Sequence, residues 1–75
     1  MSKEDLYYME EEQSLNEIAD FLERIAGNLR QGNIIFSDDC KLDLPENVRL
    51  NIDVDRRTKP DVTATSAEIE LKWEE

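Results

Sequence analysis

Two stretches of strict alternation between apolar and polar residues constrain the fold of this chain more than any other feature. The first, Val48–Asp55, carries an apolar side chain at every second position, and the second, Ala67–Trp73, repeats the pattern. Successive side chains of a β-strand point to opposite faces of a sheet, so this period predicts strands with one apolar face. The stretch from Arg56 to Thr65 is polar and contains Pro60, which indicates a connection. These residues predict a long antiparallel hairpin.

One amphipathic helix is predicted upstream, at residues 14–31. Ser14 is followed three residues later by Glu17, the pairing that forms a capping box at a helix start. Gly32 suits the left-handed position that commonly follows a helix end. Between them, apolar residues recur with the spacing of a single helical stripe, namely Leu15, Ile18, Ala19, Leu22, Ile25, Ala26 and Leu29.

Shorter strand signals lie on both sides of this helix. Leu6 and Tyr8 alternate with charged or polar neighbours, which allows a short edge strand within residues 1–12, followed by an acidic connector. Residues 33–44 contain an apolar run, a Ser-Asp-Asp turn signal and a second alternating segment that Pro45 closes. Because one helix stripe matches one apolar sheet face, the sequence predicts an α+β fold with the helix packed across an antiparallel β-meander. The chain 1–75 is expected to form a single domain, with its strands in 33–73.

The helix stripe and the alternating strands together define an expected core. Trp73 shares the phase of Ile69 and Leu71, so its large apolar ring is expected to lie in that core. Cys40 is in phase with Leu42 and is expected to be a small buried side chain and not a reactive thiol. The expected core residues are Leu22, Ile25, Leu50, Ile52, Ile69, Leu71 and Trp73.

The terminal run Ala67–Trp73, AEIELKW, is distinctive in the context that precedes it. It follows a helical pattern at Ser14–Leu29, Gly32, a Leu44-Pro45 step and the alternating strand Val48–Asp55. In this order the elements resemble the Amphi-Trp domain family over nearly the whole chain. The resemblance implies a small single-domain α+β fold, and it implies no activity or catalytic residues.

Composition restricts the function classes. The 75 residues include 19 Asp and Glu against 9 Lys and Arg, a formal net charge of −10, and no His. This charge argues against direct nucleic-acid binding and against adhesion to an anionic membrane, since both need basic residues. Without His, a Gly-rich phosphate loop or cysteine metal spacing, no catalytic residue, cofactor or metal is expected. A single cysteine and the lack of a secretory signal favour a cytoplasmic location.

An acidic row on the outer face of the long hairpin is the first candidate site. The side chains of Asp53, Asp55, Glu68 and Glu70 are expected to project from one sheet face. Like charges directly opposite each other destabilise a sheet, so such a row fits a basic protein surface. It equally fits a solvated face with Arg49 and Lys72 interleaved.

Tyr7 is the second candidate, as part of an apolar cluster with Tyr8 and Met9. The cluster fits an exposed patch for a partner. It also fits a structural role in which Tyr8 packs beside Phe21 and Tyr7 is half exposed.

These observations predict a small acidic protein-binding or adaptor module without catalytic activity, which uses the outer sheet face or an edge strand. Edge strands carry unpaired backbone groups that invite pairing, so a structural homodimer formed by strand addition is an alternative. A second alternative is an acidic nucleic-acid mimic that occupies a basic protein cleft. Monomer and homodimer both stay open.

Overall fold

The helix begins and ends where the sequence predicts. The computed structural model describes residues 2–75, in which α1 spans Leu15–Arg30. At its start, the backbone N–H of Glu17 donates to Ser14 Oγ at 3.1 Å, and the backbone N–H of Ser14 donates to Glu17 Oε1 at 3.0 Å. Gly32 follows the helix end with φ of 86°, a left-handed conformation that favours glycine. The capping box and the helix-ending glycine are both confirmed.

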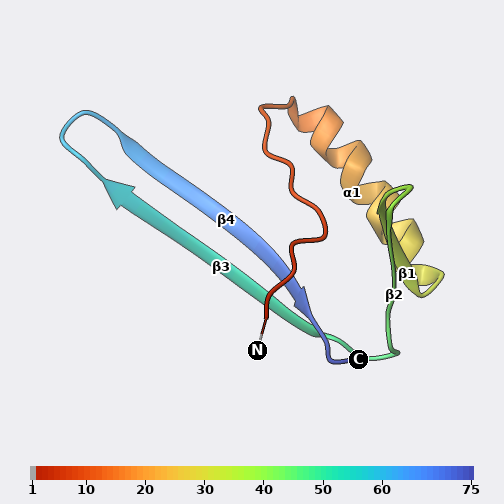
Figure 1. Cartoon of the computed structure of the whole chain (residues 1–75). Helices are drawn as coiled ribbons and strands as arrows, with labels where there is room; N and C mark the ends of the chain where they lie inside the picture. Colours follow the sequence, from red (N-terminus) through yellow and green to blue (C-terminus); the bar gives the residue numbers. More distant parts are fainter. Residues whose placement is uncertain (1) are drawn as a thin grey trace. The chain divides into compact units, whose positions relative to one another are not determined.

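The chain forms two compact units, Met1–Leu44 and Pro45–Glu75. The first contains α1, β1 (Asn33–Ser37) and β2 (Cys40–Asp43), and the second contains β3 (Arg49–Thr58) and β4 (Thr63–Lys72; Figure 1). The α+β class and the antiparallel pairing are confirmed. The strands form two separate pairs, however, and not a continuous meander. Pro45 follows β2 and cannot donate a backbone hydrogen bond, so the strand pattern stops there and resumes only at Arg49.

The β1–β2 hairpin contains the buried core of the first unit. Ile34 and Cys40 are only 3% and 5% exposed. Ile34 lies opposite Leu42, so these side chains share a face, as the alternation predicts. The expected burial of Cys40 is confirmed, and its thiol is free.

Within the first unit, α1 is covered along only one edge of its apolar stripe. Phe21, Ile25 and Asn28 are half-buried and follow one line along the helix, whereas Leu22 is exposed. Since α1 meets β1 and a helix stripe is about 100° wide, a narrow two-stranded hairpin covers only part of it. Ile25, which was expected in the core, is therefore partly buried. Leu22, which was also expected there, is exposed.

The N-terminal edge strand is not formed. Residues 2–14 contain neither helix nor strand. The two adjacent tyrosines interrupt the alternation that a half-buried strand needs, and charged residues flank the run Leu6–Met9 on both sides. The side chain of Tyr7 links this segment to the β1–β2 hairpin, because its ring stacks on Phe36 of β1.

The second unit is a hairpin whose register is unbroken from the pair Arg49–Lys72 to the pair Thr58–Thr63. Its turn is closed by two hydrogen bonds between Lys59 and Val62, at N···O distances of 2.8 and 3.3 Å. The strands therefore continue through most of the segment predicted as a connection.

The apolar face of this hairpin is open within its own unit. Leu50, Ile52 and Ile69 were expected in the core and are 58%, 61% and 68% exposed, while Leu71 and Trp73 are half-buried. A two-stranded hairpin has no second layer to cover its side chains. The alternation thus predicted the strands and their apolar face correctly, but the second unit does not bury that face by itself.

Replacing Ile34 by Ala should lower the free energy of unfolding of the first unit by about 2–5 kcal/mol, because it leaves a cavity in the small core. Ile35→Ala is the matched control, since Ile35 is 38% exposed on the neighbouring position of the same strand. Urea unfolding followed by far-UV circular dichroism of α1 measures both. Equal losses for the two variants would contradict this assignment of the core.

The capping box should make α1 sensitive to acid. The hydrogen bonds that the Glu17 carboxylate accepts from the Ser14 backbone and from its side chain lower the pKa of Glu17. A lowered pKa stabilises the folded state above the ordinary Glu pKa, and this contribution disappears as the pH falls through the lowered value. Ser14→Ala should cost about 1 kcal/mol near neutral pH. Circular dichroism should show that Glu17→Gln removes part of the acid-induced helix loss, and an unchanged acid profile would contradict the prediction.

Candidate functional site: the outer face of the β3–β4 hairpin

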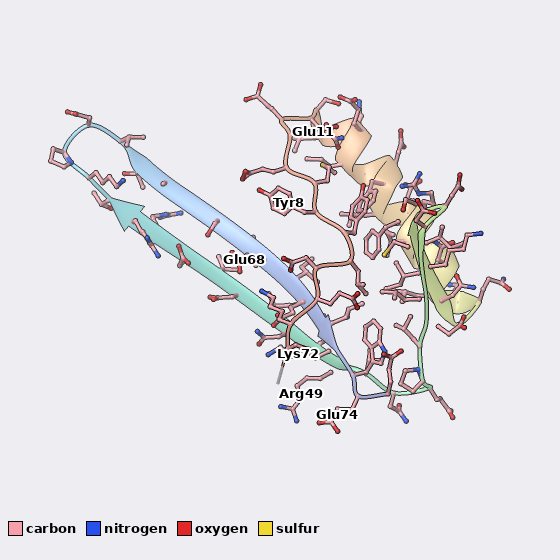
Figure 2. All side chains as sticks on the ribbon, viewed as in Figure 1. Tyr8, Glu11, Arg49, Glu68, Lys72 and Glu74 are labelled. Carbon is pink, nitrogen blue, oxygen red and sulfur yellow. The ribbon has the colours of Figure 1, made fainter. Side chains whose placement is uncertain are left out.

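The β3–β4 register brings the four acidic candidates onto one face. Residues directly opposite each other in an antiparallel pair share a face, and so do residues two apart along a strand. The pairs on this outer face are Arg49–Lys72, Asn51–Glu70, Asp53–Glu68, Asp55–Ser66 and Arg57–Ala64. Figure 2 shows Glu68 partway along β4, with Arg49 and Lys72 toward one end of the hairpin.

Asp53 and Glu68 stand out because two carboxylates are directly opposite each other. Within residues 2–75, neither forms an ion pair. Glu70 lies 3.5 Å from the Lys72 ammonium, an exposed pair of small energetic value. Asp55 accepts a hydrogen bond from the Ser66 hydroxyl at 3.3 Å. The repulsion at Asp53 and Glu68 is therefore the least compensated feature of the face.

The face also carries a depression that is partly open to solvent. Asn51, Asp53, Glu68, Ile69 and Glu70 line it. Carboxylate and amide oxygens at such a surface can accept hydrogen bonds from ammonium or guanidinium groups. Within residues 2–75, no group of three or more His, Cys, Asp or Glu side chains is placed to hold a metal ion.

Asn51 is a member of this face that the sequence reasoning did not single out. Its position in the alternation of Val48–Asp55 already placed it beside Asp53. It lacks a charge and is therefore not part of the predicted acidic row. Its pairing with Glu70 shows that the polar surface is wider than the acidic row.

Tyr7 belongs to the first unit and is part of an aromatic cluster there. Its ring stacks on Phe36 with centroids 5.4 Å apart, and Phe36 lies 6.5 Å from Phe21. The Arg24 guanidinium carbon is 5.3 Å from the centre of the Phe21 ring. The structure therefore gives Tyr7 a packing contact, although it is still 47% exposed.

The expected packing of Tyr8 beside Phe21 is wrong. Tyr8, which Figure 2 labels, is 81% exposed, and its hydroxyl donates to Glu10 Oε1 at 3.2 Å. Phe36 is the residue that organises the cluster. It lies at a β-bulge, between the paired residues Ile35 and Ser37, an irregularity with no signal in the alternation.

Among residues 2–75, no helix combines the length and the apolar character that crossing a bilayer requires.

Glu68→Lys should stabilise the β3–β4 hairpin by about 0.2–1 kcal/mol, because it replaces a repulsive cross-strand pair with an attractive one. Amide hydrogen exchange along β3 and β4 measures the change. Glu12→Lys is the control, since Glu12 changes the net charge equally and lies outside any strand. The same slowing of exchange in both variants would show that net charge matters and the Asp53–Glu68 pair does not.

Comparison with known proteins identifies the family but no characterised relative. The model of the Amphi-Trp domain matches residues 1–75, the whole chain. No curated protein and no solved structure matches significantly. The resemblance noted in the helix, the Leu-Pro step and the Trp-terminated strand is thus confirmed over the full length: the chain belongs to the Amphi-Trp domain family.

Proposed function

We propose that this chain is a non-catalytic protein-binding module that presents the outer face of its β3–β4 hairpin to a basic protein surface. The direct opposition of Asp53 and Glu68 carries the proposal. Opposed like charges cost a sheet about 0.2–1 kcal/mol, and a cationic side chain placed between them converts this repulsion into attraction. A basic partner would therefore bind most strongly at Asp53 and Glu68, where the negative charges of the free chain are least compensated.

The spacing of the acidic row suits an extended basic segment. Glu68 and Glu70 lie on the same face of β4, two residues apart, which corresponds to about 6.6 Å along a strand. Alternate side chains of an extended partner have the same spacing. A segment with Lys or Arg at every second position could therefore contact successive carboxylates. Such contacts form in a partly open depression and need no deep pocket.

Arg49 and Lys72 would determine the orientation in which the partner segment binds. They lie opposite each other on the same face as the acidic row. Their positive charge repels a basic side chain and favours an acidic one. Electrostatic patterns of this kind determine the orientation of a complex and its association rate more than its final affinity.

The non-catalytic assignment and a cytoplasmic location are parts of the same proposal. Asp53, Glu68 and Glu70 line one partly open depression, whereas acid–base catalysis needs carboxylates whose environments differ strongly. The free thiol of Cys40 fits a reducing compartment.

A charge-reversal experiment tests the binding face. Asp53→Lys combined with Glu70→Lys reverses the row, and Asp38→Lys combined with Asp39→Lys makes the same change in net charge at the exposed β1–β2 turn. A peptide with Lys at alternate positions is titrated against each variant at several salt concentrations, with binding followed by NMR. We expect the hairpin variant to bind about tenfold more weakly, equivalent to about 1.4 kcal/mol, and the turn variant to bind like the wild type.

Equal weakening in both variants would show that only net charge attracts the peptide, and the proposed face would be wrong. Binding that shifts the amide signals of the first unit and leaves those of β3 and β4 unchanged would also contradict it. Circular dichroism of each variant beforehand establishes that the hairpin is intact.

A further inference from the structure

β3 leaves one long backbone edge unpaired. Among the described residues it pairs only with β4, so the groups along its other side have no strand partner. Proteins usually protect such an edge with Pro, a bulge, a short strand or a charge on the apolar face. β3 is 10 residues long, contains no Pro and pairs with β4 without a bulge. On its apolar face β3 carries one charged residue, Arg56, which lies beyond the segment Arg49–Asp55.

We propose that a second copy of this chain pairs with the edge of β3 in an antiparallel orientation, with Ile52 on the two-fold axis. A symmetric pairing of β3 with β3 closes on itself, whereas pairing of β3 with β4 of another copy would leave further edges open and produce a fibre. Antiparallel pairing also keeps the apolar faces of both copies on one side of the joined sheet.

The apolar residues match in this register. Ile52 lies opposite Ile52 of the second copy, and Leu50 lies opposite Val54 of the second copy. These three residues alternate along β3 and share its apolar face. Directly opposite apolar side chains on neighbouring strands contact each other, so the register joins two exposed rows into one.

The charged residues on the outer face match equally well. Arg49 lies opposite Asp55 of the second copy, and Asn51 lies opposite Asp53 of the second copy. By symmetry each pair occurs twice. The guanidinium can pair with a carboxylate and the amide can donate to one, so no like charges meet at the new interface.

Other symmetric registers of β3 are less favourable. A pairing centred on Asp53 places that carboxylate opposite itself, and one centred on Val54 places Asp53 opposite Asp55. A pairing centred on Asn51 avoids like charges, but it spans only Arg49–Asp53 because β3 begins at Arg49. The remaining registers of similar or greater overlap place Asp55 opposite itself or Arg56 opposite itself.

The edge of β4 offers no comparable register. In a symmetric pairing of β4 with itself, Ile69 can lie opposite Ala67, Ile69 or Leu71 of the second copy. Each of these registers brings two glutamates together: Glu68 with Glu68, Glu68 with Glu70, or Glu70 with Glu70, in that order. Registers centred on Ala67 or Ser66 avoid like charges, but they place Ile69 opposite Thr65 or Thr63 and do not join the apolar residues. The apolar and charge patterns together therefore favour β3 as the self-pairing edge.

This inference does not rest on the proposed binding function, although its register uses Arg49 and Asp55, which lie on the same outer face. It also has a consequence for that face. Pairing through β3 gives a four-stranded sheet of order β4–β3–β3–β4, in which the acidic rows of both copies lie on the same side. A monomeric chain could still bind a basic partner, and a dimer could form without one.

Charge swapping tests the register. Sedimentation velocity of the wild-type chain over a range of concentrations should show a species of twice the chain mass. Arg49→Glu and Asp55→Arg should each reduce it to one chain mass, because each places like charges opposite each other. The double variant should restore the doubled mass. Lys72→Glu, a matched charge reversal on β4, should leave the doubled mass unchanged.

Arg49→Glu is suited to this test because Arg49 faces Lys72 within the chain, so the change improves the pairing inside the hairpin. Loss of the dimer could then not be attributed to unfolding. A single chain mass for the wild type at millimolar concentration would overturn the proposal. A dimer that persists in both single variants, or is lost equally in Lys72→Glu, would overturn it too.

A cysteine placed on the proposed axis gives a second readout. Ile52→Cys in a Cys40→Ser background should form a disulfide between copies under mild oxidation, because directly opposite residues have the required separation. Leu50→Cys in the same background should not, because its two copies would be four positions out of register. Crosslinking of both variants at the same rate, or of neither, would contradict the Ile52-centred register.

Discussion

The unbroken pairing of β3 with β4 decides where nearly every side chain of the second unit points. A slip of one residue would move Leu50 and Ile52 to the acidic side and place Asp53 on the apolar side. The apolar pairs Leu50–Leu71 and Ile52–Ile69 and the reciprocal hydrogen bonds of the Lys59–Val62 turn all specify the same register. The opposition of Asp53 and Glu68, which destabilises the hairpin locally, is a consequence of this one alignment.

The two units differ in how far they satisfy their own apolar side chains. In the first, Ile34 and Cys40 are almost fully covered, and a stacked aromatic cluster holds the N-terminal segment against β1. In the second, the strands are longer but the apolar face has no covering layer of its own. Backbone hydrogen bonds and cross-strand pairs alone define that hairpin, which makes its edges and faces the most available surfaces for association.

Features that depend on neighbours in sequence could be predicted from the sequence. Ser14 and Glu17 cap α1 through contacts three residues apart, and the alternation from Val48 to Asp55 placed the acidic residues on one face. Features that depend on contacts between distant parts of the chain could not be predicted from the sequence. Whether β2 continues into a shared sheet with β3, or whether a strand face finds a cover, is decided by packing between segments far apart along the chain.

The predictions that were wrong also depend on contacts between segments that are far apart along the chain. The segment around Leu6 had enough alternation to suggest a strand, but no neighbouring strand pairs with it among the described residues. Tyr7 and not Tyr8 meets the aromatic cluster, through stacking on Phe36, a residue at an irregularity of β1 that the alternation does not indicate. The polar residues from Arg56 to Thr58 read as a loop, yet they extend β3, since the Arg56 guanidinium donates to Thr65 Oγ1 at 3.2 Å across the hairpin.

The burial of Cys40 gives the first unit a built-in probe of its own opening. The chain has one cysteine, and 5% of it is exposed, so a thiol reagent can reach it only when β2 separates from its surroundings. The second unit contains no thiol, so its motions contribute no direct signal. The rate of labelling therefore reports the opening equilibrium of the first unit. Opening of the second unit gives no direct labelling signal. The two halves of this small chain can in this way be distinguished without introducing a further cysteine.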